Sequence, residues 1–87
     1  MYLHLGNETV VRTRDIIGIF DMENTTVSKL TRQFLADAQK GGRVVNVTPE
    51  LPKSFVVCEC DGDETVYISQ LSAATLRGRA KSKMKNL

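Results

Sequence analysis

The chain has little histidine or cysteine, two residues on which many catalytic sites depend. Its 87 residues include no tryptophan, one histidine and two cysteines. With only His4 available and no nucleophile near it, neither a Ser-His-Asp nor a Cys-His arrangement can be assembled convincingly. Gly6 and Gly18 are isolated and Gly41–Gly42 follows a helical pattern, so no glycine-rich loop for phosphate is present. These absences favour a binding protein over an enzyme, and we expect no cofactor.

Long apolar runs are also missing. No stretch approaches the ~18 consecutive apolar residues that a membrane-spanning helix requires. The segment Met1–Glu8 has no basic region, and its apolar part is too short for a signal peptide. The expected location is therefore the cytoplasm.

The two cysteines, Cys58 and Cys60, are separated by one residue. On a strand they would share a face, with Cα atoms roughly 6.5–7 Å apart, at or beyond the limit for an unstrained disulfide. Two thiols supply only half of a four-ligand metal site; His4 and Asp61 could complete one, but nothing fixes their spacing. We expect buried, reduced thiols and no metal, with a metal or redox site as the alternative.

Charge is present but unevenly distributed. The chain is 41% hydrophobic and 25% charged, with a net charge of +2. Residues 1–76 hold seven Lys/Arg against ten Asp/Glu, whereas residues 77–87 hold five Lys/Arg and no acid. This asymmetry indicates an interaction tail. We expect a single β-rich domain over residues 1–76 and a basic helical tail over 77–87.

The densest apolar run of the N-terminal half is Ile16–Phe20, flanked by charged residues. Such a run is typical of a strand buried on both faces. Gly18 within it suggests a bulge or a close approach by another backbone. Arg12 and Arg14 precede it and, on an extended chain, would share one face. They are either ordinary solvated charges or a cationic edge for a partner.

The remaining pattern predicts the order β-β-β-α-β-β-β-α, an α+β or mainly β domain. A helix is predicted from the 3.6-residue apolar period of residues 27–38, with Gly41–Gly42 ending it. Its apolar stripe comprises Val27, Leu30, Phe34, Leu35 and Ala38. Expected strands cover residues 2–5, 8–12, 16–20, 43–48, 55–60 and 63–68, with turns at Gly6-Asn7 and Asp61-Gly62.

A second helix is predicted after Ser72, whose hydroxyl can cap it. Its apolar stripe comprises Leu76, Ala80, Met84 and Leu87. Arg77, Lys81 and Lys85 flank one side of that stripe, and Arg79 and Lys83 flank the other. The tail is therefore a candidate basic amphipathic helix.

Several stretches carry a family resemblance. They are Tyr2–Gly6, Val11–Asp21, Pro52–Val57 and Ser69–Leu76, which together cover most of the chain. In these segments the sequence resembles the small bacterial extracellular-matrix regulatory proteins of the RemA/RemB family, the RemB branch most closely. The resemblance implies a transcriptional regulator of matrix or biofilm genes. It also implies a compact, β-rich, oligomeric DNA-binding fold similar to LytTR-type domains.

Arg14 matches the family position at which an arginine is implicated in DNA binding. RemA-type members also carry an arginine pair in the loop before the strand that starts near Phe55. This sequence has Pro49–Lys53 there, so only Lys53 remains of that basic element. The tail could compensate for the missing pair or mark a different partner. The candidate nucleic-acid-binding residues are Arg12, Arg14, Arg43, Lys53, Arg77 and Arg79.

Three functions remain open. The first is an oligomer that binds double-stranded DNA through its phosphates, because phosphate neutralisation dominates affinity and repeated subunits multiply a weak cationic edge. With no aromatic-rich face and no evident recognition helix, backbone and shape readout are expected over base readout. The second is a partner protein of a related regulator with little DNA binding of its own. The third is attachment to an anionic membrane surface through the tail, which its thin apolar stripe disfavours.

Overall fold

The computed structural model describes the backbone of residues 1–22 and 28–85 and the side chains up to Lys81 within those ranges. The elements of this part are β1 (Tyr2–Gly6), β2 (Thr9–Arg12), a 3₁₀ turn η1 (Thr13–Asp15), β3 (Ile16–Asp21), α1 (Lys29–Lys40), β4 (Val44–Asn46), β5 (Ser54–Cys60), β6 (Asp63–Ser69) and α2 (Ala73–Lys85). This order confirms the predicted α+β class. The likeness to LytTR-type domains stays a prediction.

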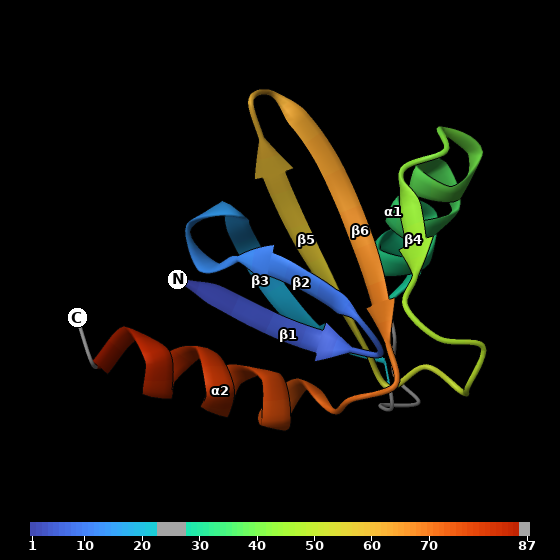
Figure 1. The fold of residues 1–87 in the computed structure, drawn as a ribbon. Coiled ribbons are helices and arrows are strands. Elements are labelled where there is room, and N and C mark those ends of the chain that lie inside the picture. The colour runs from blue at the N-terminus through green and yellow to red at the C-terminus, as the bar shows by residue number, and fades with distance from the viewer. Residues whose placement is uncertain (23–27, 86–87) are drawn as a thin grey trace.

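The strands form a hairpin and a four-stranded sheet. β1 and β2 pair only with each other, and the larger sheet has the order β3-β5-β6-β4. Within it β5 runs antiparallel to β3 and β6, while β4 runs parallel to β6. Figure 1 shows the β1-β2 hairpin and α2 together on one side of the sheet, with α1 beside β4 and β6.

Strand β5 is the centre of the core because both of its faces are covered. Val56 and Cys58 pack with residues of the hairpin and α2, among them Leu3 and Leu76. The alternate residues, Phe55 and Val57, pack with residues of α1. A run that is apolar at every position, as Phe55–Cys58 is, therefore fits a strand between two layers.

The prediction that Ile16–Phe20 forms a strand buried on both faces is wrong for β3. It lies at an edge of the sheet, and Ile17 has 59% of its surface exposed. The predicted bulge is present, since Ile16 pairs with Cys58 and Gly18 with Val57, which leaves Ile17 as the extra residue. A Cβ on Gly18 would meet the Phe20 ring at 2.6 Å, so the close approach comes from a side chain and not from a backbone.

Helix α1 begins later than the periodicity suggested. Ser28 is its N-cap and accepts a hydrogen bond from the Thr31 amide, and Gly41 ends the helix as predicted. Ala38 is fully buried, but Leu30 is 83% exposed, so its place in the buried stripe is wrong. Val27 lies outside the described residues.

The turns agree largely with their sequence signals. Asp61 and Gly62 both have positive φ (52° and 85°), as an Asp-Gly type I′ turn requires, and they join β5 to β6. In the first hairpin the strands extend to Gly6 and start again at Thr9. The connecting residues are therefore Asn7-Glu8, one position later than the predicted Gly6-Asn7. Strand β4 is shorter than the predicted 43–48.

Helix α2 is anchored to the core. Ser72 caps it as predicted, accepting a hydrogen bond from the Thr75 amide at 3.1 Å. Leu76 is fully buried, and Ala80 packs against the same cluster. The helix continues through the predicted domain boundary at residue 76, and the division into domain and tail stays a prediction. Met84 and Leu87 lie outside the side chains described. Neither described helix combines the length and apolarity needed to cross a bilayer.

Candidate nucleic-acid interface

Arg14 lies in η1, the short turn between β2 and β3. The Ile16 amide, at the C-cap, donates to the Thr13 carbonyl, and the Thr13 amide donates to the Met1 carbonyl at 3.0 Å, so the turn is fixed at both ends. Arg14 is exposed and forms no ion pair within the described residues. Its charge is therefore available to a partner in solution.

Arg12, two residues earlier, is held by other groups. Its Nε donates to Asp15 Oδ2 at 2.8 Å, and its Nη2 donates to Cys60 Sγ at 2.8 Å. The hydrogen bond and charge of Asp15, followed by Cys60, raise the pKa of Arg12 above its ordinary value, so the guanidinium stays charged. Because residues 13–15 form a 3₁₀ turn, the prediction that Arg12 and Arg14 share one face of an extended chain is wrong.

Arg77 and Arg79 extend from α2 to two different strands. Arg77 Nη2 donates to the Ile19 carbonyl of β3 at 2.7 Å, and Arg79 Nη1 donates to the His4 carbonyl of β1 at 3.4 Å. Both side chains stay exposed. The helical period thus placed them correctly on opposite flanks of the Leu76–Ala80 stripe. Lys81 is exposed as well.

Arg43 and Lys53 lie away from these residues. Arg43 directly precedes β4, whereas Arg14 lies in the η1 turn that leads into β3, and these two strands are opposite edges of the sheet. Arg43 also forms an ion pair with Glu64. The Lys53 carbonyl accepts from the Met22 amide, so Lys53 lies beside the far end of β3 from Arg14. The structure brings Arg12 and Arg14 close in one turn, and it does not unite all six predicted cations on one edge.

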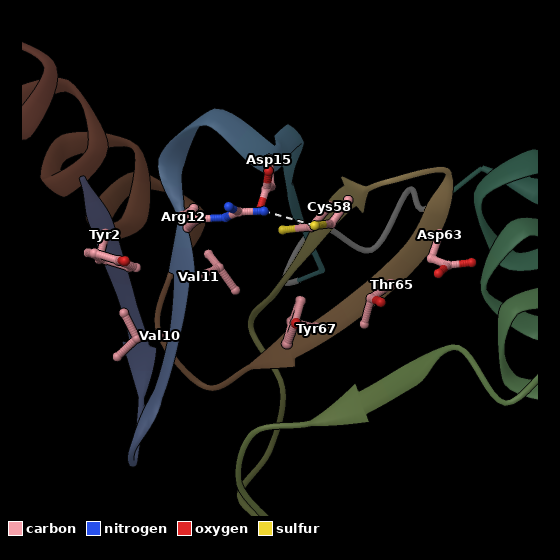
Figure 2. A pocket seen from close by; sticks show the side chains of 10 residues that line it. Tyr2, Val10, Val11, Arg12, Asp15, Cys58, Asp63, Thr65 and Tyr67 are labelled. Atoms are coloured by element: carbon pink, nitrogen blue, oxygen red, sulfur yellow. Dashed lines mark hydrogen bonds and ion pairs between the residues drawn. The ribbon is translucent and has the colours of Figure 1, made fainter.

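A cavity of about 270 Å³ is lined by residues of the β1-β2 hairpin and of the larger sheet. Figure 2 shows the Arg12 side chain extending between β2 and β5, with Asp15 beside it. The lining residues are Tyr2, Val10, Val11, Arg12, Asp15, Cys58, Cys60, Asp63, Thr65 and Tyr67. Burial raises the pKa of Cys58 to about 11, and burial is also the main cause that raises the pKa of Tyr67.

Both cysteines are free, Cys58 buried and Cys60 partly exposed. His4 is exposed on the opposite face of β1 from Leu3 and Leu5, which are buried. Its Nε2 lies 2.9 Å from the Asn7 carbonyl. Among the residues described, no cluster of three or more His, Cys, Asp or Glu side chains has the geometry to hold a metal ion.

A family model described as extracellular matrix regulatory protein A-like (RemA-like) matches residues 2–80. The chain belongs to this family. The RemA-like chain is also 41% identical over 81 residues to the extracellular matrix regulatory protein B of Bacillus subtilis (strain 168). That match covers 93% of the chain and 91% of the relative. These findings confirm the resemblance that the sequence carried, and the family name describes a regulatory protein.

Sequence reasoning missed two residues that hold Arg12 in place. Asp15 was considered only as a flanking charge, although an acid three residues after Arg12 is the spacing that a tight turn brings together. The contact between Cys60 and Arg12 could not be predicted from the sequence. The two residues are 48 positions apart, and their contact depends on how the hairpin lies over the sheet.

Proposed function

We propose that this protein binds double-stranded DNA as a homo-oligomer and regulates the transcription of extracellular matrix genes. The observation that carries the proposal is the exposed guanidinium of Arg14, which forms no ion pair within the described residues and lies on a turn hydrogen-bonded at both ends. Membership of the RemA-like family supports the regulatory role. An exposed cation of this kind is suited to a phosphate contact, because it gives up no ion pair on binding.

Helix α2 carries further exposed cations. Arg77, Arg79 and Lys81 are exposed, and residues 73–87 include no acid. Figure 1 shows η1 and the C-terminal half of α2 toward the same side of the molecule, where the N-terminus also lies. We propose that these side chains contact phosphates together with Arg14, while Arg12 holds the turn in place. Direct contacts by Arg43 and Lys53 remain predictions.

The oligomer is proposed because one subunit presents few free cations. Repeating the Arg14 and α2 surface in several subunits would raise the affinity without any new type of contact. An apolar groove of about 350 Å³ between α1 and β3 supports self-association. Ile17 and Leu30 line it and are strongly exposed. A second copy of the chain would remove this apolar surface from water.

The same groove supports a second candidate, a protein partner of a related regulator. That function needs the apolar groove and does not need Arg14. Membrane attachment through the tail has less support, because Leu76 and Ala80 of the α2 stripe pack against the protein core and are not free to enter a bilayer.

The test is a DNA-binding titration at several salt concentrations, with light scattering on the same samples. We expect a multi-subunit particle whose affinity falls steeply with salt. Arg14→Ala should weaken binding to all sequences and lower the salt slope by about 1 for each phosphate that the variant no longer neutralises. Lys40→Ala, which removes one positive charge at the far end of α1, is the matched control. A well-formed oligomer that ignores DNA at low salt would favour the partner-protein candidate.

A further inference from the structure

The proposed DNA contacts leave one part of the molecule without a role. Cys58 and Cys60 lie two residues apart on β5, and both line the cavity between the hairpin and the sheet. Cys60 is partly exposed at this cavity, whereas Cys58 is only 5% exposed. Two thiols therefore line the same cavity, but a reagent in the cavity can reach Cys60 more easily than Cys58.

The sulfur of Cys60 has a cationic donor on one side and an acid on the other. Arg12 Nη2 donates to Sγ at 2.8 Å, and the Sγ–H group donates to Asp61 Oδ2 at 3.8 Å. A guanidinium that donates to a sulfur is placed to stabilise negative charge that develops there during a reaction. The more distant carboxylate acts in the opposite sense. Because Arg12 is held in place by Asp15, its guanidinium is already oriented toward the sulfur.

Cys58 is the thiol in the same protein with which the reactivity of Cys60 can be compared. Burial raises the pKa of its thiol to about 11, and the nearby charge of Asp15 adds to this effect. In the described part of the chain its sulfur takes part in no hydrogen bond. A buried thiol without a cationic neighbour is a poor nucleophile at neutral pH.

We propose that Cys60 is a site of reversible thiol–disulfide modification by small cationic disulfides. The Cys60 thiol releases its proton to solvent, and the thiolate attacks one sulfur of the reagent. A bond forms between Cys60 Sγ and that sulfur, the reagent's own S–S bond breaks, and its other half leaves as a thiolate. The reagent is thereby the oxidant. The cavity of about 270 Å³ has room for one small substituent.

The charge around the cavity gives the preference for cationic reagents. Asp15 and Asp63 line it together with Arg12, and Asp61 lies at the sulfur. Since Asp15 is paired with Arg12, the two remaining carboxylates give the opening a negative balance. A disulfide that carries ammonium groups should therefore react faster than one that carries carboxylates. This inference does not rest on DNA binding.

The experiment treats the reduced, full-length protein with cystamine or with 3,3′-dithiodipropionate at pH 7. Intact mass spectrometry and peptide mapping follow the product. We expect one cysteamine adduct on Cys60 that reductant removes, formed about tenfold faster than the carboxylate adduct. Cys60→Ser should abolish the adduct, and Cys58→Ala should leave its rate unchanged.

Two further variants replace the charged neighbours of Cys60, and we expect them to change the reaction rate in opposite directions. Arg12→Gln should slow the reaction about tenfold, and Asp61→Asn should accelerate it. Asn is well tolerated at the positive φ of this turn, so Asp61→Asn keeps the fold even where Arg12→Gln weakens it. Modification of Cys58 or an internal Cys58–Cys60 disulfide would overturn the proposal. Equal reaction rates in the wild type, Arg12→Gln and Asp61→Asn would overturn it as well. DNA binding enters none of these measurements.

Discussion

At the scale of single residues, Arg12 and Arg14 show how one turn gives two identical side chains different tasks. Arg12 is bound to Asp15 and to the sulfur of Cys60, whereas Arg14 is exposed without an ion pair in the described part of the chain. The first stabilises the structure around it, and the second offers its charge outward. Replacing both arginines at once would therefore mix a structural effect with a binding effect.

The buried thiol of Cys58 gives a prediction about alkaline pH. Its pKa in the folded protein is about 11, compared with 9.0 as its ordinary value. Between these values the unfolded chain releases the proton and the folded chain keeps it, so the free energy of unfolding falls as the pH rises. The loss attributable to Cys58 should approach about 2–3 kcal/mol.

Urea unfolding at several pH values checks this, with Cys58→Ala as the comparison. Tyr67, whose pKa is raised mainly by burial and next by the charge of Cys58, contributes a loss of the same sign. The part of that loss caused by burial cancels in the difference, and the part caused by Cys58 adds to the effect of the thiol. Identical pH dependence in the wild type and in Cys58→Ala would contradict the expected role of the thiol.

At the scale of elements, α2 is a structural part of the core as well as a carrier of charge. Leu76 is fully buried in the cluster that joins α2, the hairpin and β5. Leu76→Ala should lower the free energy of unfolding by about 2–5 kcal/mol, since it leaves a cavity in that cluster. Leu51→Ala, at a leucine that is 83% exposed, is the matched control and should have little effect. Denaturant unfolding measures both, and similar losses would show that α2 does not depend on this anchor.

Two glycines allow a test of backbone conformation without new contacts. A Cβ added at Gly62 or at Gly78 would meet nothing within 4 Å, but Gly62 has a φ of +85° in the type I′ turn. Gly62→Ala should therefore destabilise the protein by about 1–2 kcal/mol. Gly78→Ala, inside α2, should stabilise it by about 0.5–1 kcal/mol. Thermal unfolding gives the sign of each change, and the same sign for both would contradict this account.

The sequence predicted which helices and strands form better than it predicted which of them lie next to one another. Element order, the end of α1 at Gly41, the Ser72 cap of α2 and the Asp61-Gly62 turn follow from local signals, and all were found. The run Ile16–Phe20 was expected to be central but lies at an edge, because apolar content does not reveal which strands will pair on each side. The same limit applies to the site. The helical period placed Arg77 and Arg79 correctly, whereas the contact of Arg12 with Cys60 depends on long-range packing.

At the scale of the whole molecule, size limits what one subunit can do with DNA. The chain measures 37 × 30 × 23 Å, so its longest dimension spans about one turn of the double helix, ~34 Å. Within that span only Arg14 and the α2 cations are proposed to reach phosphates. A regulator that must compete with non-specific binding therefore gains from repetition, which is why DNA binding and assembly are proposed together.

Assembly can be tested at the apolar groove. Ile17→Asp and Leu30→Asp each place a charge on strongly exposed positions that line it. Each should reduce the particle mass seen by light scattering to that of a single chain and weaken DNA binding at the same time, because avidity is lost. Leu51→Asp changes an equally exposed leucine outside the groove and should preserve the mass. Intact particles in both groove variants would exclude the groove as the interface.

The parallel pairing of β4 with β6 has a consequence during protein synthesis. β4 leaves the ribosome before β5 and β6, yet its partner in the sheet is β6, so Val44–Asn46 must wait for residues 63–69 to emerge. The β5-β6 hairpin, closed by a two-residue turn, can form first and then receive β4 along its outer edge. A nascent chain that stalls before Asp63 exposes β4 and one side of β5. Such a fragment is the form that chaperones and proteases would capture.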